Sequence, residues 1–410
     1  MVVRTRRTLA PGVLASLSAL VLLASGCTGT AAAGGSTAGP SGSTTTSSTP
    51  TPTTPPVALL ANVKEGDTVD VSTAVKAWAT DGALNTVILK PEGTFKENPG
   101  EVPGTVDPGQ ATWVAARLLD PGRSYTLTMS GANADGVTAT STIRFETKAL
   151  SRDEEVYPYS IPGDGATVGV AMPVVLTFDL AVKDKASFEK HLTVTSVPAQ
   201  VGSWRWVSDR EVHWRPKDYW TPGTKVTVEA KLNGVPAGGG RFGQMDRVAH
   251  FTVGRSVVAK VDLAAHNLKL YVGGKLANTI PVTGGKPGFT TRSGSKVIME
   301  KLWTTRMVST GAKKGDPDYY DLSDVRYAMR VTWSGEFLHA APWSVGYQGH
   351  ANVSHGCVGM STGNASWLYE QMKVGDPVIV SGTGRSLDEG NGWTDWNMSY
   401  ADFAKGSALS

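Results

Sequence analysis

Alternating hydrophobic and polar positions run through most of the chain after residue 56 and predict many short strands. Between residues 57 and 147 six such runs are separated by turn signals: VALLANV, TVDVSTAVKAWA, NTVILK, ATWVAARLL, YTLTMSGA and STIRFET. Strands at this spacing, with little helical periodicity between them, are typical of a β-sandwich.

Residues 150–254 have the same pattern, and we interpret the two segments as a repeat. Each segment has a tryptophan followed eight positions later by Pro-Gly, then an alternating strand, and finally a strand with phenylalanine: Trp113, Pro121-Gly122 and Phe145 in the first, and Trp214, Pro222-Gly223 and Phe251 in the second. The pattern predicts two sandwich domains, over 57–149 and 150–254.

A third β-rich segment extends over residues 255–382. Two strands over 257–271 precede a hairpin turn at Gly273-Gly274. The run MRVTWSGEFLHA is predicted to be one buried strand that carries Ser334-Gly335 and ends at His339. A helix over 364–372 and a closing strand over 374–380 follow.

The C-terminal segment, residues 383–410, has four aromatic residues at offsets 0, 3, 7 and 10: Trp393, Trp396, Tyr400 and Phe403. This spacing predicts one stripe of a helix packed on the body of the protein. Exposed aromatics that bind sugar are the alternative.

The N-terminus has the features of an export signal. Residues 1–26 hold three arginines and then an apolar run too short to span a bilayer comfortably, and they end in Ala24-Ser25-Gly26 before Cys27. The small residues before the cysteine resemble a lipobox and predict a lipoprotein signal peptide with lipidation at Cys27. A secreted form without lipid and an uncleaved anchor are alternatives. Residues 27–56, rich in Ser, Thr and Pro, are predicted to be a tether.

Charge and cysteine content narrow the class of protein. Removal of residues 1–26 leaves 39 − 3 = 36 basic and 36 acidic groups, so the formal net charge falls from +3 to zero. Nothing in this balance indicates a nucleic-acid partner. With Cys27 lipidated, the second of the two cysteines, Cys357, has no disulfide partner.

The candidate chemistry lies in residues 339–361, which contain Cys357 and three of the seven histidines. A neighbouring imidazole is the usual means of activating a cysteine nucleophile. Glycines at 356 and 359 let the backbone bend and approach a substrate. Two other interpretations remain open: a buried core cysteine, and a zinc site, for which the possible ligands are His339, His350, His355 and Cys357. Paired ligands such as CxxC are absent.

At these residues the sequence resembles the L,D-transpeptidases, bacterial cysteine enzymes that cross-link peptidoglycan outside the membrane. Their signature is a histidine, fourteen to seventeen residues, then Ser/Thr-His-Gly-Cys, an apolar residue and usually asparagine. Here His339 is followed by fourteen residues and then by Ser354-His355-Gly356-Cys357-Val358, whereas Gly359 replaces the asparagine. Residues 280–286 and 291–294 resemble the opening motif, and 304–327 match the flap that covers the substrate groove.

The resemblance implies a mostly β protein, in which two immunoglobulin-like sandwich domains precede a β-rich catalytic domain of YkuD type and a short C-terminal helical segment. Cys357 is the implied nucleophile, and His339 is its base, oriented by the backbone carbonyl of the next residue. His355 orients the site. Backbone N–H groups of His355, Gly356 and Cys357 form the oxyanion hole. The implied substrate-binding residues are Tyr320 (or its neighbour Tyr319), Ser334, Gly335, Trp343 and Ser354.

The implied reaction takes a donor tetrapeptide stem, releases D-alanine and forms a 3→3 cross-link to diaminopimelate of a second stem. Carbapenems are the implied inhibitors, and no cofactor or metal is expected. The protein is expected to be exported, lipid-anchored and active in the wall space. A carboxypeptidase that uses water as acceptor needs the same groups. A binding lipoprotein with a decayed site is suggested by Gly359 alone, and the intact motif argues against it. Gly359 predicts a slow enzyme that Gly359→Asn accelerates if the loop accommodates the side chain.

Overall fold

The computed structural model describes residues 54–93, 100–309 and 311–410. The predicted signal peptide, Cys27 and all but the last three residues of the predicted tether lie outside the described residues. Within the described part of the chain, no helix has the length and apolar character needed to cross a membrane.

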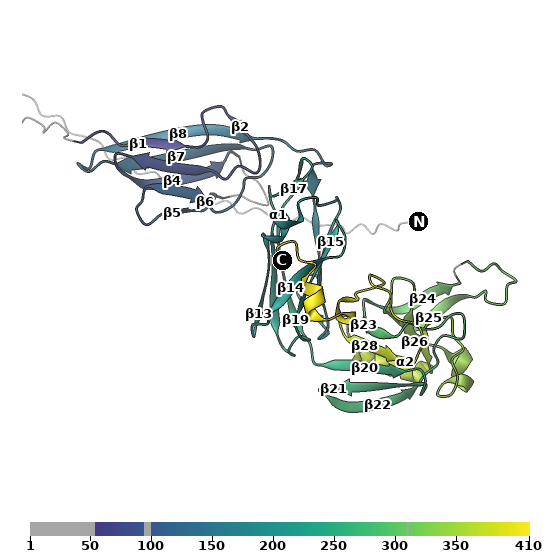
Figure 1. The fold of residues 1–410 in the computed structure, drawn as a ribbon. Coiled ribbons are helices and arrows are strands. Elements are labelled where there is room, and N and C mark those ends of the chain that lie inside the picture. The colour runs from purple at the N-terminus through teal and green to yellow at the C-terminus, as the bar shows by residue number, and fades with distance from the viewer. Residues whose placement is uncertain (1–53, 94–99, 310) are drawn as a thin grey trace, which may run out of the picture. The chain divides into compact units, whose positions relative to one another are not determined.

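The first group of strands forms two four-stranded sheets, in the orders β1-β3-β6-β5 and β2-β8-β7-β4 (Figure 1). Buried side chains of both sheets form one hydrophobic cluster, which includes Trp113, Tyr125 and Phe145. The strands are β1 (Ala58–Ala61), β2 (Thr68–Val69), β3 (Lys76–Thr80), β4 (Ala83–Pro91), β5 (Gly104–Val106), β6 (Thr112–Ala115), β7 (Ser124–Ala132) and β8 (Thr138–Thr147).

The second group repeats this topology, with sheets β10-β12-β15-β14 and β11-β19-β16-β13. A small sheet, β17-β18-β9, and one short helix, α1 (Lys185–Glu189), are additions. The strands are β9 (Glu155–Val156), β10 (Pro158–Ile161), β11 (Ala166–Val168), β12 (Val174–Phe178), β13 (Leu192–Val197), β14 (Gly202–Trp206), β15 (Glu211–Pro216), β16 (Lys225–Lys231), β17 (Pro236–Gly238), β18 (Arg241–Gly243) and β19 (Asp246–Val253).

The same glycine–tryptophan contact occurs in both sandwiches. Gly104 begins β5, and an added Cβ there would lie 2.0 Å from the ring of Trp113 on the adjacent strand. Gly202 begins β14, and an added Cβ would lie 2.1 Å from the ring of Trp214. Only glycine lets the indole lie flat over the neighbouring strand at this distance. Topology and this contact together confirm the repeat predicted from the tryptophan and Pro-Gly spacing.

The remaining strands form a five-stranded sheet, β22-β21-β20-β28-β23, and a four-stranded sheet, β24-β25-β26-β27. One hydrophobic cluster draws side chains from both sheets and from α2 (Thr362–Gln371). The strands are β20 (Val257–Asp262), β21 (Asn267–Val272), β22 (Lys275–Pro281), β23 (Gly294–Val297), β24 (Glu300–Val308), β25 (Asp321–Arg330), β26 (Phe337–Ala340), β27 (Val358–Met360) and β28 (Pro377–Ser381), and a 3-10 helix, η1, spans Pro342–Tyr347.

Sequence predictions for this part were largely confirmed, with one clear error. The hairpin turn at Gly273-Gly274 is present, with φ of +57° and +78°. The single strand predicted over MRVTWSGEFLHA is wrong, because β25 ends at Arg330 and β26 begins at Phe337. Between them Gly335 has φ +95° and donates its N–H to the Thr332 carbonyl, which closes a tight turn.

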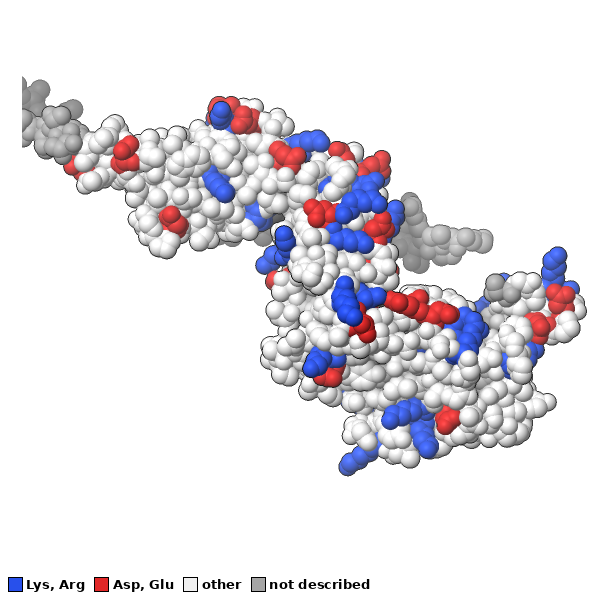
Figure 2. All heavy atoms as spheres, viewed as in Figure 1, with Lys and Arg blue, Asp and Glu red and all other residues white. Residues whose placement is uncertain are grey.

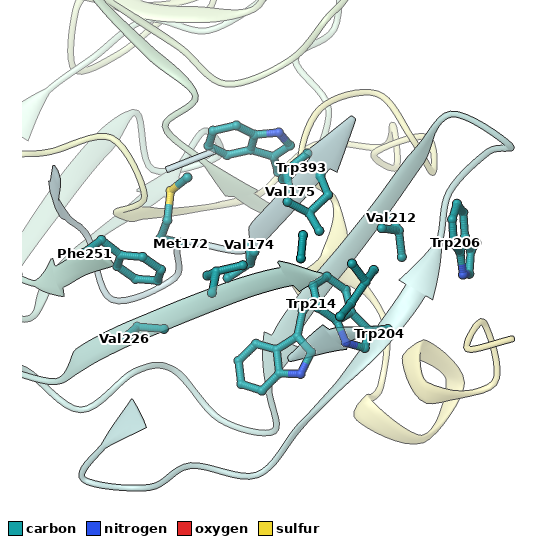
Figure 3. Packing of buried hydrophobic residues seen from close by; sticks show 14 of the residues in the cluster. Met172, Val174, Val175, Trp204, Trp206, Val212, Trp214, Val226, Phe251 and Trp393 are labelled. Carbon is teal, nitrogen blue, oxygen red and sulfur yellow. The ribbon is translucent and has the colours of Figure 1, made fainter. Parts of the chain in front are cut away.

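The C-terminal segment contains two short helices, η2 (Asp395–Asn397) and α3 (Tyr400–Ala404), so the prediction of one continuous helix is wrong. Ser399 accepts from the backbone N–H of Asp402 and thereby starts a new helix. The aromatics are nonetheless packed. Figure 3 shows Trp393 against Val175 of the second sandwich, and the Trp396 indole donates to the Ala171 carbonyl at 2.7 Å.

Basic and acidic side chains lie interspersed among uncharged residues on the face drawn in Figure 2. This distribution agrees with the near balance of charges in the sequence.

Candidate active site

Strands β26 and β27 place the candidate catalytic residues. The strands are parallel, and their register pairs Leu338 with Val358 and His339 with Gly359. Cys357 directly precedes β27 and therefore lies beside Phe337, the first residue of β26. The fourteen residues between His339 and Ser354 form η1 and a loop that returns the chain to the neighbouring strand.

His339 is 5% exposed and has a fixed orientation. Its Nδ1 lies 2.8 Å from the carbonyl oxygen of Ala340, so Nδ1–H is the donor and Nε2 keeps its lone pair. This is the backbone carbonyl expected from the sequence. Burial lowers the pKa of His339, and the hydrogen bond to Ala340 opposes that shift only in part. The imidazole is therefore neutral at pH 7 and can act as a base.

Cys357 is partly exposed, and its sulfur is held by backbone groups on two sides. The thiol donates to the Gly335 carbonyl at 3.5 Å. Burial raises the pKa of Cys357 to about 11, although a hydrogen bond from the backbone of Phe337 lowers it. The thiol is therefore neutral at rest, and its deprotonation must accompany substrate binding or attack. Because the residue lines a cleft, it is not a core cysteine.

One cleft of about 290 Å³ brings the predicted groups together. Cys357 and His339 lie in it with residues from the hairpin of β24 and β25, which corresponds to the predicted flap. Its other lining residues are Thr283, Met307, Tyr320, Leu322, Ala341, Trp343, Ser344, Val353, Ser354, His355 and Gly359. Tyr320 rather than Tyr319 lines the cleft, and the Trp343 ring lies 5.9 Å from that of His339, nearly parallel to it.

Ser354 organises the nucleophile loop. Its hydroxyl donates to the Cys357 carbonyl at 2.6 Å and accepts from the N–H of Gly356 at 3.1 Å. The Gly356 N–H is thus engaged inside the loop and is not free for an oxyanion in this arrangement. For the N–H groups of His355 and Cys357 no hydrogen-bond partner occurs among the described residues. Two of the three predicted oxyanion donors are therefore available.

His355 lies between two aromatic rings. Its ring centre is 4.7 Å from that of Phe289 and 4.9 Å from that of Tyr320. Burial and the Lys286 ammonium lower the pKa of His355, while Asp318 opposes this shift. Asp318 Oδ1 is 3.6 Å from Nε2, which is too long for a hydrogen bond. His355 therefore packs against the flap tyrosine, and its Nε2 has no hydrogen-bond partner among the described residues.

Ser334 and Gly335 lie in the turn between β25 and β26. The carbonyl of Gly335 accepts a hydrogen bond from the Cys357 thiol, as described above. Ser334 does not line the cleft with Cys357. Its hydroxyl contacts Thr332 and Asn391, and the residue lines a neighbouring polar cavity that shares Tyr320 and His355 with the cleft. The prediction that Ser334 binds substrate stays a prediction.

The zinc interpretation finds no support in the part of the chain that the structure describes. No three His, Cys, Asp or Glu side chains gather there in a way that could hold a metal ion. His350 is exposed. The Nδ1 of His339 is already occupied by a backbone carbonyl.

Sequence reasoning missed two buried threonines that hold the site. Thr283 accepts from the N–H of Val353 and donates to the Ala351 carbonyl, and its backbone pairs with Gly359. Thr291 donates to the Gly356 carbonyl at 2.9 Å. Both lie in the motif segments 280–286 and 291–294. A buried hydroxyl within a motif was the available signal, because such a group needs partners.

Comparisons with known proteins agree with this site. A family model described as the L,D-transpeptidase catalytic domain matches residues 256–380, and one described as a bacterial Ig domain matches residues 66–236. L,D-transpeptidase 2 of Mycobacterium tuberculosis is 35% identical over 354 residues, which cover 85% of this chain and 85% of that protein. L,D-transpeptidase 5 of the same organism is 38% identical over 60% of this chain and 55% of its own length.

Among solved structures, an L,D-transpeptidase in complex with imipenem is 37% identical. It covers 54% of this chain and 97% of its own, with a TM-score of 0.48. The protein is thus mostly β, with an immunoglobulin-like part and an L,D-transpeptidase fold. Because L,D-transpeptidase 2 is 35% identical over a stretch that covers 85% of both chains, this chain belongs to the L,D-transpeptidase family.

Proposed function

We propose that this protein forms 3→3 cross-links in peptidoglycan through a thioester on Cys357. The observation that carries the proposal is the pairing of Cys357 and His339 in one cleft, with Nε2 of His339 left as the only free base nitrogen of that ring. The donor is a tetrapeptide stem that ends in D-alanine.

Acylation follows from the neutral state of both groups. The sulfur attacks the diaminopimelate carbonyl carbon, the thiol proton passes to His339 Nε2, and a C–S bond forms. The oxyanion accepts from the N–H groups of His355 and Cys357. When the tetrahedral intermediate collapses, the C–N bond to D-alanine breaks and His339 returns the proton to the leaving amine.

The acceptor completes the cycle. The side-chain amine of diaminopimelate from a second stem attacks the thioester carbon and gives its proton to His339. The C–N bond forms, the C–S bond breaks, and the sulfur recovers the proton. Water in place of the amine yields a tripeptide, so the acceptor alone separates transpeptidation from hydrolysis.

Two further features belong to the proposal. Carbapenems acylate Cys357, in line with the imipenem complex of a relative. The protein is exported and anchored by lipid on Cys27, which lies outside the described residues. Cys27→Ser is expected to move the protein from the membrane fraction to the soluble fraction on cell fractionation. Unchanged membrane association of this variant would favour an uncleaved apolar anchor.

The full chain carrying Cys27→Ser, incubated with disaccharide-tetrapeptide, tests the reaction. We expect cross-linked dimer and free D-alanine by mass spectrometry, and neither product from the same chain with Cys357→Ala. Tripeptide without dimer would mean a carboxypeptidase. No reaction and no adduct with donor or imipenem would mean a binding lipoprotein. Full activity of Cys357→Ala would refute the nucleophile assignment.

A further inference from the structure

A buried cluster of charges lies behind Cys357, and the reaction described above does not use it. The side chain of Lys296 is fully buried, that of Glu336 is 6% exposed, and that of Arg292 is 13% exposed. Burying such charges is costly, and well-packed apolar residues often do as well. The presence of these buried charges beside the nucleophile therefore suggests that they have a function.

Glu336 lies between Gly335 and Phe337 in the chain, and the backbone of each of these two neighbours is hydrogen-bonded to the sulfur of Cys357. The Gly335 carbonyl accepts from the thiol, and the backbone of Phe337 is hydrogen-bonded to the same sulfur. Any shift of the backbone at Glu336 therefore moves both groups relative to Cys357.

The Glu336 carboxylate is bound on both of its oxygens. Oε1 accepts from the backbone N–H of Arg292 at 3.1 Å and from its Nη1 at 3.0 Å. Oε2 accepts from the ammonium of Lys296 on β23. The backbone N–H of Glu336 donates to Thr332 Oγ1 at 2.8 Å. Side chain and backbone are thus fixed together.

The same side chain also supports the nucleophile loop. A Cβ added to Gly356, the residue before Cys357, would lie 3.7 Å from Glu336 Cγ. The Glu336 side chain therefore lies close to the loop that carries Cys357, and both line the polar cavity next to the cleft.

We infer that Glu336, fixed by Lys296 and Arg292, is a positioning residue that holds the backbone of residues 335–337 and the loop at Gly356 so that Cys357 faces His339. The inference rests on the proposed function, since it assigns these residues to the same nucleophile. Glu336 does not touch the substrate and is not a catalytic residue.

A purely electrostatic role makes the opposite prediction. Burial raises the pKa of Cys357 most and the backbone hydrogen bond of Phe337 lowers it next; of the neighbouring charges, Glu336 raises this pKa and Lys296 lowers it. Removing the Glu336 charge therefore lowers the pKa of the thiol and, if charge were all that mattered, would make Cys357 more reactive. A positioning role predicts slower acylation in spite of the lower pKa.

The test uses the full chain with Cys27→Ser, so that Cys357 is the only thiol. Glu336→Gln, Lys296→Met and the double variant are compared with Asp209→Asn, which breaks the exposed Lys183–Asp209 ion pair of the second sandwich. Two measurements are made: D-alanine release from the tetrapeptide donor, and the pH profile of alkylation by iodoacetamide.

We expect Glu336→Gln to lower kcat for D-alanine release about 10- to 100-fold with KM little changed, because small misplacements of a reacting group cost rates of this order. Its alkylation profile should shift to lower pH. The double variant removes the unpaired ammonium and keeps the fold testable if Glu336→Gln unfolds, and it should stay slow. Asp209→Asn should match the parent.

Rates within twofold of the parent for Glu336→Gln and the double variant, or a faster Glu336→Gln, would overturn the inference. A parent chain that alkylates normally but never releases D-alanine would refute the proposed function. Positioning would then be judged from alkylation alone: it predicts slower alkylation of the Glu336→Gln thiolate at high pH, and an unchanged plateau would refute it.

Discussion

Two histidines with almost no exposed surface, His339 in the catalytic domain and His213 in the second sandwich, have opposite pKa shifts. His213 is 2% exposed, with Nδ1 2.8 Å from Asp395 and Nε2 2.7 Å from Glu211. Burial lowers its pKa, but the two carboxylates outweigh burial and raise the pKa to about 9. His339 is hydrogen-bonded to a backbone carbonyl instead of a carboxylate, so burial prevails and lowers its pKa.

The difference shows that burial does not by itself make a histidine catalytic. The Nδ1 of His213 connects β15 with Asp395 of the C-terminal segment, its Nε2 pairs with Glu211 of the same strand, and the ring stays charged at neutral pH. His339 uses one nitrogen for orientation and keeps the other free for a proton. The first arrangement suits stability and the second suits proton transfer.

Replacing His339 should change the acylation rate more than any other substitution proposed below. His339→Gln removes the base but keeps a polar side chain, so we expect acylation to fall about 10²- to 10⁴-fold, the usual contribution of general base catalysis. Burst release of D-alanine measures it. His213→Gln is the matched control and should acylate at close to the parent rate under conditions where it is folded. Equal losses in both variants would mean that His339 acts only through stability.

His213 should make stability, not acylation, depend on pH. Its folded pKa of about 9 exceeds the usual histidine pKa of 6.5, so its contribution is complete below about pH 6.5 and is lost as pH rises through about 9. The shift corresponds to about 3 kcal/mol. Urea unfolding at pH 6.5 and pH 9.5 measures it, and Asp395→Asn should remove most of the difference.

The titration of a second buried group, Asp376, also makes stability depend on pH and must be distinguished from that of His213. Burial raises the pKa of Asp376 to about 7, so its titration lowers stability as pH rises from about 4 to 7, mostly below the His213 window. A difference between pH 6.5 and 9.5 that persists unchanged in Asp395→Asn would contradict the role given to His213.

Features that depend on local sequence patterns could be predicted from the sequence. The Trp and Pro-Gly spacing predicted the repeat, and the family resemblance of the motif at 339–357 predicted the backbone carbonyl found beside His339; the roles of Cys357 and His339 as nucleophile and base stay predictions. The turn at residues 331–336 was missed because its apolar flanks read as one strand. Glu336 and Lys296 were missed because charged residues in strands are usually exposed, and only tertiary pairing, 40 residues apart, buries them.

Gly359 shows a further limit of reasoning from a motif. The residue lines the cleft opposite His339, and both of its backbone groups pair with Thr283 at 2.9 Å. An added Cβ would lie 2.9 Å from the Cβ of Ala341 and 3.2 Å from Thr283 Cγ2. The first distance is shorter than packed carbon atoms tolerate. The site therefore does not provide the room on which the expected acceleration by Gly359→Asn depended.

Gly359→Asn should accordingly have the smallest effect of these substitutions, and it should lower both stability and the acylation rate. Overpacking of this kind costs about 1 to 3 kcal/mol, so we expect a lower urea midpoint and slower acylation. Adding Ala341→Gly removes the nearest contact and should recover part of both losses, whereas Ala341→Gly alone should not improve the parent. If Gly359→Asn acylates faster than the parent at unchanged stability, the strand yields to the side chain, and asparagine contributes to donor binding here as the family pattern first suggested. His339 would then differ from His213 in one more respect. The strand next to His339, β27, would be able to shift, whereas two carboxylates hold His213 of β15 in place.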